Sequence, residues 1–142
     1  MAKDTLRSVH IERTAAGQYL VRNARGDSLT VGSGAEGSFT PVELLLAAIG
    51  CCTAIDVDVV TSRRAEPDEF TVTVTGDKIR DAATGNRMEN LAARFTVSFP
   101  EGEAGDAARE VLPQAVRISH ERVCTVSRTV ELGTPVSMII GP

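Results

Sequence analysis

Apolar residues dominate the stretch Leu44–Val60, where only a glycine, a threonine and two aspartates interrupt them. The residues just before it are typical of a helix start. Thr40 can cap a helix, Pro41 suits the first helical position, and Glu43 stands three residues after Thr40, as in a capping box. We therefore expect one long helix within residues 38–64. Because a helix that is apolar on almost every face is buried, it should lie at the centre of the molecule.

Three short segments before this helix have the character of strands. They cover Leu6–Thr14, Gln18–Arg22 and Leu29–Val31, and stretches rich in turn-forming residues separate them. Gly26 in the second of these stretches can adopt a positive φ, which a tight turn often needs. The segments predict an N-terminal antiparallel meander.

The clearest alternation of apolar and polar residues follows the long helix. Phe70, Val72 and Val74 alternate with threonines, and a second run alternates over Leu91–Phe99. The polar loop Asp81–Arg87 connects the two runs. This pattern predicts a long antiparallel hairpin.

The C-terminal third predicts a second helix, a short further turn or helix, and a strand. Asp106 can cap a helix that runs towards His120, and Pro113 should kink or restart it. A new turn or helix begins at Cys124, and the apolar run Thr134–Ile140 predicts a closing strand. The residues expected to face inwards are Ala115, Val116, Ile118 and Val123.

Taken in order, these elements predict one α+β domain over residues 1–142. At 142 residues, with 42% hydrophobic and 24% charged residues, the chain can bury a core without disulfide staples. The other predicted elements of one chain are too few to bury every face of the long apolar helix. We expect a second copy of the chain to complete the core, in an intertwined homodimer that packs the central helices together.

The net charge and the expected cellular compartment limit the binding partners that this protein can have. A net charge of -4 and a pI near 5.2 argue against nucleic acid and against an anionic membrane surface. Asp56 and Asp58 interrupt the apolar run, which is shorter than the roughly 20 residues that a bilayer needs. The first 13 residues contain no apolar signal segment, so we expect a cytoplasmic protein whose cysteines are thiols.

The three cysteines are the candidate chemistry. Free cysteine is commonly a small buried apolar residue, and this interpretation stays open for all three. However, Cys52 lies in the buried helix, while Cys124 lies at a predicted helix start, where backbone N–H groups favour a thiolate. One such thiolate can attack the O–O bond of a peroxide and become a sulfenic acid, which the second thiol captures as a disulfide. The spacing of the cysteines and of His10 and His120 predicts no metal site and no cofactor.

The phrase TPVELLLAAIGCCTAIDV at residues 40–57, followed by CTVS at 124–127, resembles the OsmC/Ohr family of osmotically inducible and organic hydroperoxide resistance proteins. Within it, the chain is most similar to the OsmC-like branch, whose helix reads approximately SPxELLLxALGGCTAIDV. The resemblance covers most of the chain. It implies an α+β fold, an intertwined homodimer with active sites at the subunit interface, and thiol-dependent reduction of organic hydroperoxides. An external reductant, either a lipoyl-type dithiol or a small thiol, would restore the two thiols.

Residue by residue, the resemblance implies that Cys52 is the peroxidatic and Cys124 the resolving cysteine. Cys51 stands where this branch has glycine and points about 100° away from Cys52 around the helix, so we assign it to packing. In the reductases a Glu directly follows the Pro and pairs with an Arg. Here Val42 takes that place, and Glu43, one residue later, is either catalytic or simply part of the capping box. The candidate arginines are Arg13, Arg22 and Arg25.

Two further interpretations stay open beside the peroxidase. A carboxylate at Asp56, one turn beyond Cys52, raises the pKa of a buried thiol and weakens it as a nucleophile. The chain could then be a stress protein that binds a small apolar ligand at the dimer interface with little peroxidase activity, or a dimeric structural domain with inert thiols. For the peroxidase, we expect the helix face around Leu45, Ile49 and Ile55 to line the pocket for an alkyl hydroperoxide.

Overall fold

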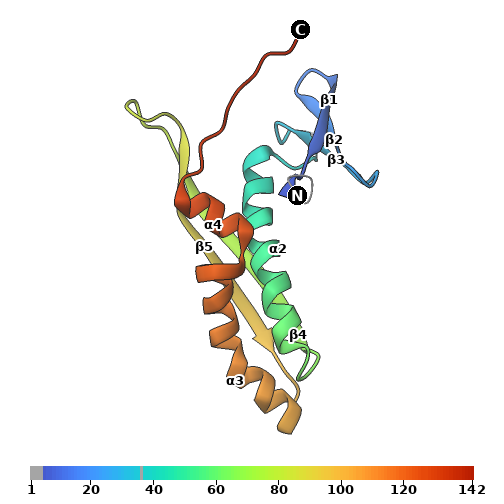
Figure 1. Ribbon diagram of the computed structural model, residues 1–142, viewed down its shortest axis with the longest axis vertical. Helices are drawn as coiled ribbons and strands as arrows, with labels where there is room; N and C mark the ends of the chain where they lie inside the picture. The colour runs from blue at the N-terminus through green and yellow to red at the C-terminus, as the bar shows by residue number, and fades with distance from the viewer. Residues whose placement is uncertain (1–4, 36) are drawn as a thin grey trace. The chain divides into compact units, whose positions relative to one another are not determined.

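The computed structural model describes residues 5–35 and 37–142 (Figure 1). The chain divides into two compact units, Met1–Leu45 and Leu46–Pro142, which are described in turn. The chain contains both α-helices and antiparallel β-strands, as predicted for an α+β protein. That they form a single domain over residues 1–142 stays a prediction.

The first unit contains a three-stranded antiparallel sheet in the order β1-β2-β3. Its strands are β1 (Val9–Ala15), β2 (Gln18–Asn23) and β3 (Ser28–Gly32). Gly26 adopts a φ of 97° in the turn between β2 and β3, where the Asn23 side chain accepts two backbone N–H bonds. The predicted meander and the role of this glycine are confirmed.

The long helix α2 (Pro41–Thr61) begins where the sequence predicts it. The Glu43 N–H donates to the Thr40 hydroxyl oxygen over 3.2 Å, and the Thr40 N–H donates to the Glu43 carboxylate over 2.9 Å. These reciprocal bonds satisfy backbone donors that the first helical turn leaves without a partner. The capping box is therefore confirmed.

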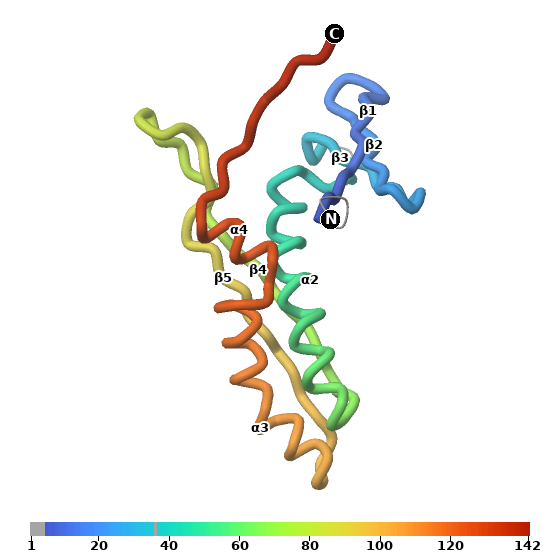
Figure 2. Tube along the Cα trace, in the orientation of Figure 1, coloured from blue at the N-terminus to red at the C-terminus, as the bar shows by residue number. Residues whose placement is uncertain are grey.

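The second unit is built on a long hairpin of β4 (Glu69–Ile79) and β5 (Arg87–Ser98), paired antiparallel as predicted. Residues 46–61 of α2 and the helix α3 (Glu103–Ile118) run alongside it (Figure 2). The approach of α2 is close at Gly50, where an added Cβ would lie 2.6 Å from a methyl group of Val74. Glycine at this position lets the helix pack directly on β4.

The start of α3 and its continuity differ from the prediction. Gly102, with a φ of 116°, caps the helix, and the Asp106 N–H already donates to the Gly102 carbonyl within it. The prediction of Asp106 as the cap was therefore wrong, and its carboxylate instead pairs with Arg109. Pro113 does not break the helix. A restart at Pro113 is therefore wrong, whereas a kink there stays a prediction; Ala108 and Ala115 are buried on either side of the proline.

A single π-helical turn, η1 (Ser119–Val123), follows α3 without a break and leads into α4 (Thr125–Leu132). The Cys124 N–H donates to the Ser119 carbonyl over 2.7 Å, which closes the wide turn. Of the residues expected to face inwards, Ala115 is buried and Val116 half-buried, while Ile118 and Val123 are 42% and 53% exposed. The extra residue of a π-turn shifts the helical phase, which moves Val123 off the buried face.

The closing strand does not form within this chain. Residues 134–142 have no regular secondary structure, and Val136, Met138, Ile139 and Ile140 are at least 78% exposed. Hydropathy alone predicts a strand there, but a strand exists only where its backbone finds a partner strand.

By length and hydropathy, α2 is the one helix among the described residues that could cross a membrane. Only 28% of its most apolar window is buried within the chain. Length and hydropathy alone do not distinguish a membrane-spanning helix from the core helix of a soluble protein. The Asp56 carboxylate on α2 accepts a hydrogen bond from Ser119, which is the kind of contact that a helix in a protein core makes.

Candidate functional site

The two thiols assigned to redox chemistry meet in the second unit. Cys52 lies in the middle of α2, and Cys124 caps the N-terminus of α4. Their Sγ atoms and one carboxylate oxygen of Asp56 all lie within 4.8 Å of one another. Residues 72 positions apart in the sequence are thus brought close enough to form a disulfide after a small movement.

Cys124 is fully buried and surrounded by hydrogen-bond donors. The Thr53 hydroxyl donates to its Sγ over 3.3 Å and the Ser127 N–H over 3.4 Å, and the Ser127 hydroxyl lies at 3.4 Å. Burial acts to raise the pKa of Cys124, but the hydrogen bonds from Ser127, Thr53 and Cys52 outweigh it and leave the pKa lowered. The site therefore favours the thiolate at Cys124, as the position at a helix start predicts.

Cys52 has the opposite balance. Burial is the largest influence and raises its pKa, and the hydrogen bond to Cys124 and the negative charges of Cys124 and Asp56 raise it further. A hydrogen bond from the Val126 N–H opposes these effects only in part. The predicted influence of Asp56 on this thiol is confirmed. Of the two thiols, Cys124 therefore ionises more readily, and Cys52 holds its proton more tightly.

Asp56 is held in place by a residue that the sequence gives no reason to select. The Ser119 hydroxyl donates to Asp56 Oδ2 over 2.7 Å, and Ser119 is only 1% exposed. A signal for Asp56 exists, since it stands four residues after Cys52 on the same helix face. Ser119 reaches it from the π-helical turn, and that contact depends entirely on how η1 packs against α2.

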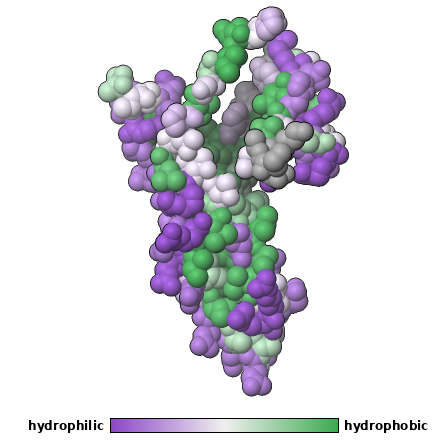
Figure 3. All heavy atoms as spheres, viewed as in Figure 1, coloured by the Kyte–Doolittle hydropathy of each residue, from purple (hydrophilic) through white to green (hydrophobic). Residues whose placement is uncertain are grey.

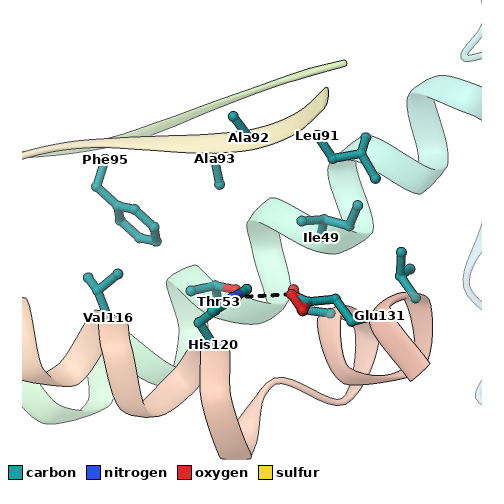
Figure 4. A pocket seen from close by; sticks show the side chains of 11 residues that line it. Ile49, Thr53, Leu91, Ala92, Ala93, Phe95, Val116, His120 and Glu131 are labelled. Carbon is teal, nitrogen blue, oxygen red and sulfur yellow. Dashed lines mark ion pairs between the residues drawn. The ribbon is translucent and has the colours of Figure 1, made fainter. Parts of the chain in front are cut away.

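A cavity of about 340 Å³ adjoins the thiol pair (Figure 4). Thr53 and Ser127 line it and also contact the Cys124 sulfur, so these two residues separate the cavity from the thiol. Figure 4 shows side chains from α2, β5, α3 and η1 converging on the same space. Much of the lining is apolar, and it includes Ile49, Leu91, Ala93, Phe95 and Val116.

The expected pocket face on α2 is only partly present. Ile49 lines the cavity, whereas Ile55 is 64% exposed on another side of the helix, and Leu45 is not among the lining residues. His120 also lines the cavity and pairs with Glu131 at 3.1 Å (Figure 4).

Cys51 does not join the thiol pair. It is exposed within the single chain and borders a second hollow of about 440 Å³ between α2 and β4, beside Gly50 and Val74. This location agrees with the 100° that separates neighbouring residues around a helix.

The charged groups named from the resemblance all lie in the first unit. The exposed Glu43 has its carboxylate in the capping box, Arg22 pairs with Glu12 at 3.4 Å, and Arg25 approaches Asp27 at 4.0 Å. A catalytic role for Glu43, and activation of Cys52 by Arg22, Arg25 or the exposed Arg13, stay predictions.

Comparison with known proteins agrees with this architecture. The family model for OsmC-like protein matches residues 33–139, so the chain belongs to the OsmC-like family. An uncharacterized protein of Mycobacterium tuberculosis is 32% identical over 130 residues, which cover 90% of this chain and 91% of that protein. The family assignment from residues 40–57 and 124–127 is confirmed.

Two solved structures show the same fold. An OsmC-like protein of unknown function from Vibrio cholerae is 14% identical, with a TM-score of 0.73 over 89% of this chain and 94% of that one. An organic hydroperoxide resistance protein OsmC from Legionella pneumophila is 16% identical, with a TM-score of 0.57 over 89% and 90%. At these identities the likeness concerns the fold alone.

The hydrogen bond from Thr53 predicts a measurable shift of the Cys124 pKa. We expect Thr53→Val to raise the pKa of Cys124 by about one to two pH units, because a hydrogen bond to a charged group contributes about 1.5–3 kcal/mol and a change of one in pKa corresponds to 1.36 kcal/mol. The measurement is the pH dependence of Cys124 alkylation in a chain whose Cys51 and Cys52 are serine. Thr61→Val is the matched control, because its hydroxyl donates within α2 to the Val57 carbonyl. An equal shift in both variants would contradict the assignment.

Proposed function

We propose that this protein reduces organic hydroperoxides with the thiol pair Cys52 and Cys124. The observation that carries the proposal is the convergence of the two sulfurs within 4.8 Å, on separate elements. The donors around Cys124 and the apolar cavity beside it add support. So does family membership, since a solved relative of the same fold is described as an organic hydroperoxide resistance protein.

Access decides which thiol attacks. Cys124 is fully buried, whereas Cys52 is half-buried and is therefore the more accessible of the two thiols. The lowered pKa of Cys124 suits this residue to act as the base for Cys52. Its thiolate accepts the proton of Cys52, so that the more accessible sulfur becomes the nucleophile when a peroxide is present.

The reaction then balances in three steps. The Cys52 thiolate attacks the terminal oxygen of the peroxide, the O–O bond breaks, and Cys52 becomes a sulfenic acid. The departing alkoxide takes the proton that Cys124 holds and leaves as the alcohol. The Cys124 thiolate attacks the Cys52 sulfur, the disulfide forms, and the hydroxide released takes a solvent proton to give water.

The reductant that restores the thiols is a lipoyl-type dithiol or a small thiol, which reduces the disulfide by thiol–disulfide exchange. A cycle that returns to free thiols requires a reducing compartment, and we propose the cytoplasm. The apolar lining of the cavity suits the alkyl part of the hydroperoxide, and the 340 Å³ volume admits a small to medium chain.

We also propose that the protein is a homodimer. On α2, Ile55 is 64% and Val59 49% exposed, and further apolar side chains lie on the surface of the unit 46–142 (Figure 3). Exposed apolar area of this extent on one helix is typical of an interface. A second copy would cover α2 and could offer strand partners to residues 134–140.

A second candidate function has its own support. The raised pKa of Cys52 and the nearby Asp56 carboxylate disfavour a reactive thiolate, as expected of a protein that binds an apolar ligand and reduces peroxide weakly. Thiols that stay reduced under excess peroxide would favour this function.

The peroxidase proposal predicts the loss of two thiols on oxidation. Reduced protein mixed with cumene hydroperoxide should lose Cys52 and Cys124 as free thiols and two hydrogens in intact mass, with a Cys52–Cys124 link in the peptide map. Cys52→Ser should abolish turnover, and Cys124→Ser should accumulate over-oxidised Cys52. Cys51→Ser is the control and should retain turnover. Full activity in Cys52→Ser would refute the assignment.

The dimer proposal predicts self-association through α2. Sedimentation should give a dimer at micromolar concentration, and Ile55→Lys should weaken it, because a charge would be buried against an apolar surface. Ile55→Met keeps the surface apolar and should leave the dimer intact. A stable, folded wild-type monomer would be inconsistent with the proposal.

Glu43→Gln separates the two roles open to Glu43. We expect unchanged stability and turnover, because the amide oxygen can accept the same Thr40 N–H bond in a capping box. Glu43→Ala should lower the free energy of unfolding by about 0.5–2 kcal/mol through loss of the cap. A fall in peroxide turnover in Glu43→Gln, with unchanged thermal unfolding, would show instead that the carboxylate takes part in catalysis.

A further inference from the structure

The thiol pair is part of a three-membered cluster whose third member the peroxide reaction does not use. Cys52 and Asp56 stand one turn apart on α2, and Cys124 joins them from the start of α4. Their two Sγ atoms and a carboxylate oxygen lie within 4.8 Å of one another. Among the described residues, this is the one group of three or more such side chains that converges in this way.

The surroundings of the cluster hold its members in place. The buried Ser119 hydroxyl donates to Asp56 Oδ2 over 2.7 Å, which orients the carboxylate and leaves Oδ1 available. Thr53 and the Ser127 N–H donate to the Cys124 sulfur. Outer hydrogen bonds of this kind fix the orientation of metal ligands and stabilise their charge.

We propose that Cys52, Asp56 and Cys124 form a binding site for Zn²⁺, with a fourth position open to water or a small thiol. Two thiolates and a carboxylate match the mixed sulfur and oxygen ligands of this borderline-soft ion, whereas Mg²⁺ and Ca²⁺ require oxygen alone. At Zn–S distances of about 2.3 Å, two tetrahedral sulfurs lie about 3.8 Å apart, so the ligands need to close by about 1 Å at most.

Binding of the ion and reduction of peroxide exclude each other at this site. Each thiol that binds Zn²⁺ releases its proton to solvent and is no longer free to attack a peroxide. Conversely, the disulfide form has lost both sulfur ligands and should not bind the ion. The inference does not rest on the proposed activity, because it needs only the geometry of the cluster and reduced thiols.

The experiment uses reduced, metal-free protein and two metal probes. Titration with Co²⁺ should produce thiolate-to-cobalt charge-transfer absorption, which one equivalent of Zn²⁺ per chain removes. Competition with a chromophoric chelator then gives the Zn²⁺ affinity. We expect Asp56→Asn to weaken binding by about 10-fold or more and Ser119→Ala by about 10-fold, as changes to ligands and to their hydrogen-bond partners do.

Two controls match these variants. Asp58→Asn removes a carboxylate two residues further along α2, outside the cluster, and Cys51→Ser removes the neighbouring thiol. Both should bind Zn²⁺ as the wild type does. The proposal is overturned if wild-type protein binds no stoichiometric Zn²⁺, or if Asp56→Asn, folded by circular dichroism, binds it as tightly as Asp58→Asn does.

Peroxide consumption by the same metal-free protein separates this proposal from the proposed function. Stoichiometric Zn²⁺ binding without turnover would support the metal site and refute the peroxidase. Turnover without Zn²⁺ binding would do the reverse. If the protein both binds Zn²⁺ and reduces peroxide, added Zn²⁺ should protect Cys52 and Cys124 from oxidation. This protection should be weaker in Asp56→Asn than in Asp58→Asn.

Discussion

The contact between α2 and the π-helical turn is the interaction on which the site depends. It brings the Ser119 hydroxyl to Asp56 and seats Cys124 against Thr53. The turn needs five residues to close, since the Cys124 N–H returns to the Ser119 carbonyl. That extra residue lets α3 end and α4 begin with Cys124 at its cap, aimed at α2. A regular α-helical continuation would carry the thiol to another face, so the wide turn determines whether two thiols meet at all.

Once the sulfurs meet, their surroundings shift the pKa values of the two thiols in opposite directions. Cys124 accepts hydrogen bonds from Thr53 and Ser127, which lower its pKa although the side chain is fully buried. Burial raises the pKa of Cys52, Cys124 and Asp56 raise it further, and the hydrogen bond from the Val126 N–H offsets these effects only in part. Reactivity and access are therefore placed on different sulfurs. Under the proposed function the peroxide meets the less acidic thiol, and in the proposed metal site the cation lies between both sulfurs and a carboxylate.

Long, strongly patterned elements could be predicted from the sequence, because their signals are local. Thr40, Pro41 and Glu43 specify the start of α2, and period-2 alternation specifies the hairpin of β4 and β5. The errors fall where tertiary packing overrides a local rule. Pro113 lies inside a continuous α3 with buried alanines on either side, and residues 134–140 form no strand because no strand among the described residues lies beside them.

The sequence by itself determined the family, the start of the long helix and the two cysteines that converge, because those features reside in contiguous motifs at residues 40–57 and 124–127. Only the tertiary structure decided what surrounds the thiols. Thr53, Asp56 and Ser127 lie within those motifs and Ser119 lies outside them, but the contacts that all four make arise from the packing of α2, η1 and α4. Hydrogen bonds act over about 3 Å in space, whereas the residues that form them here are separated by up to 71 positions along the chain.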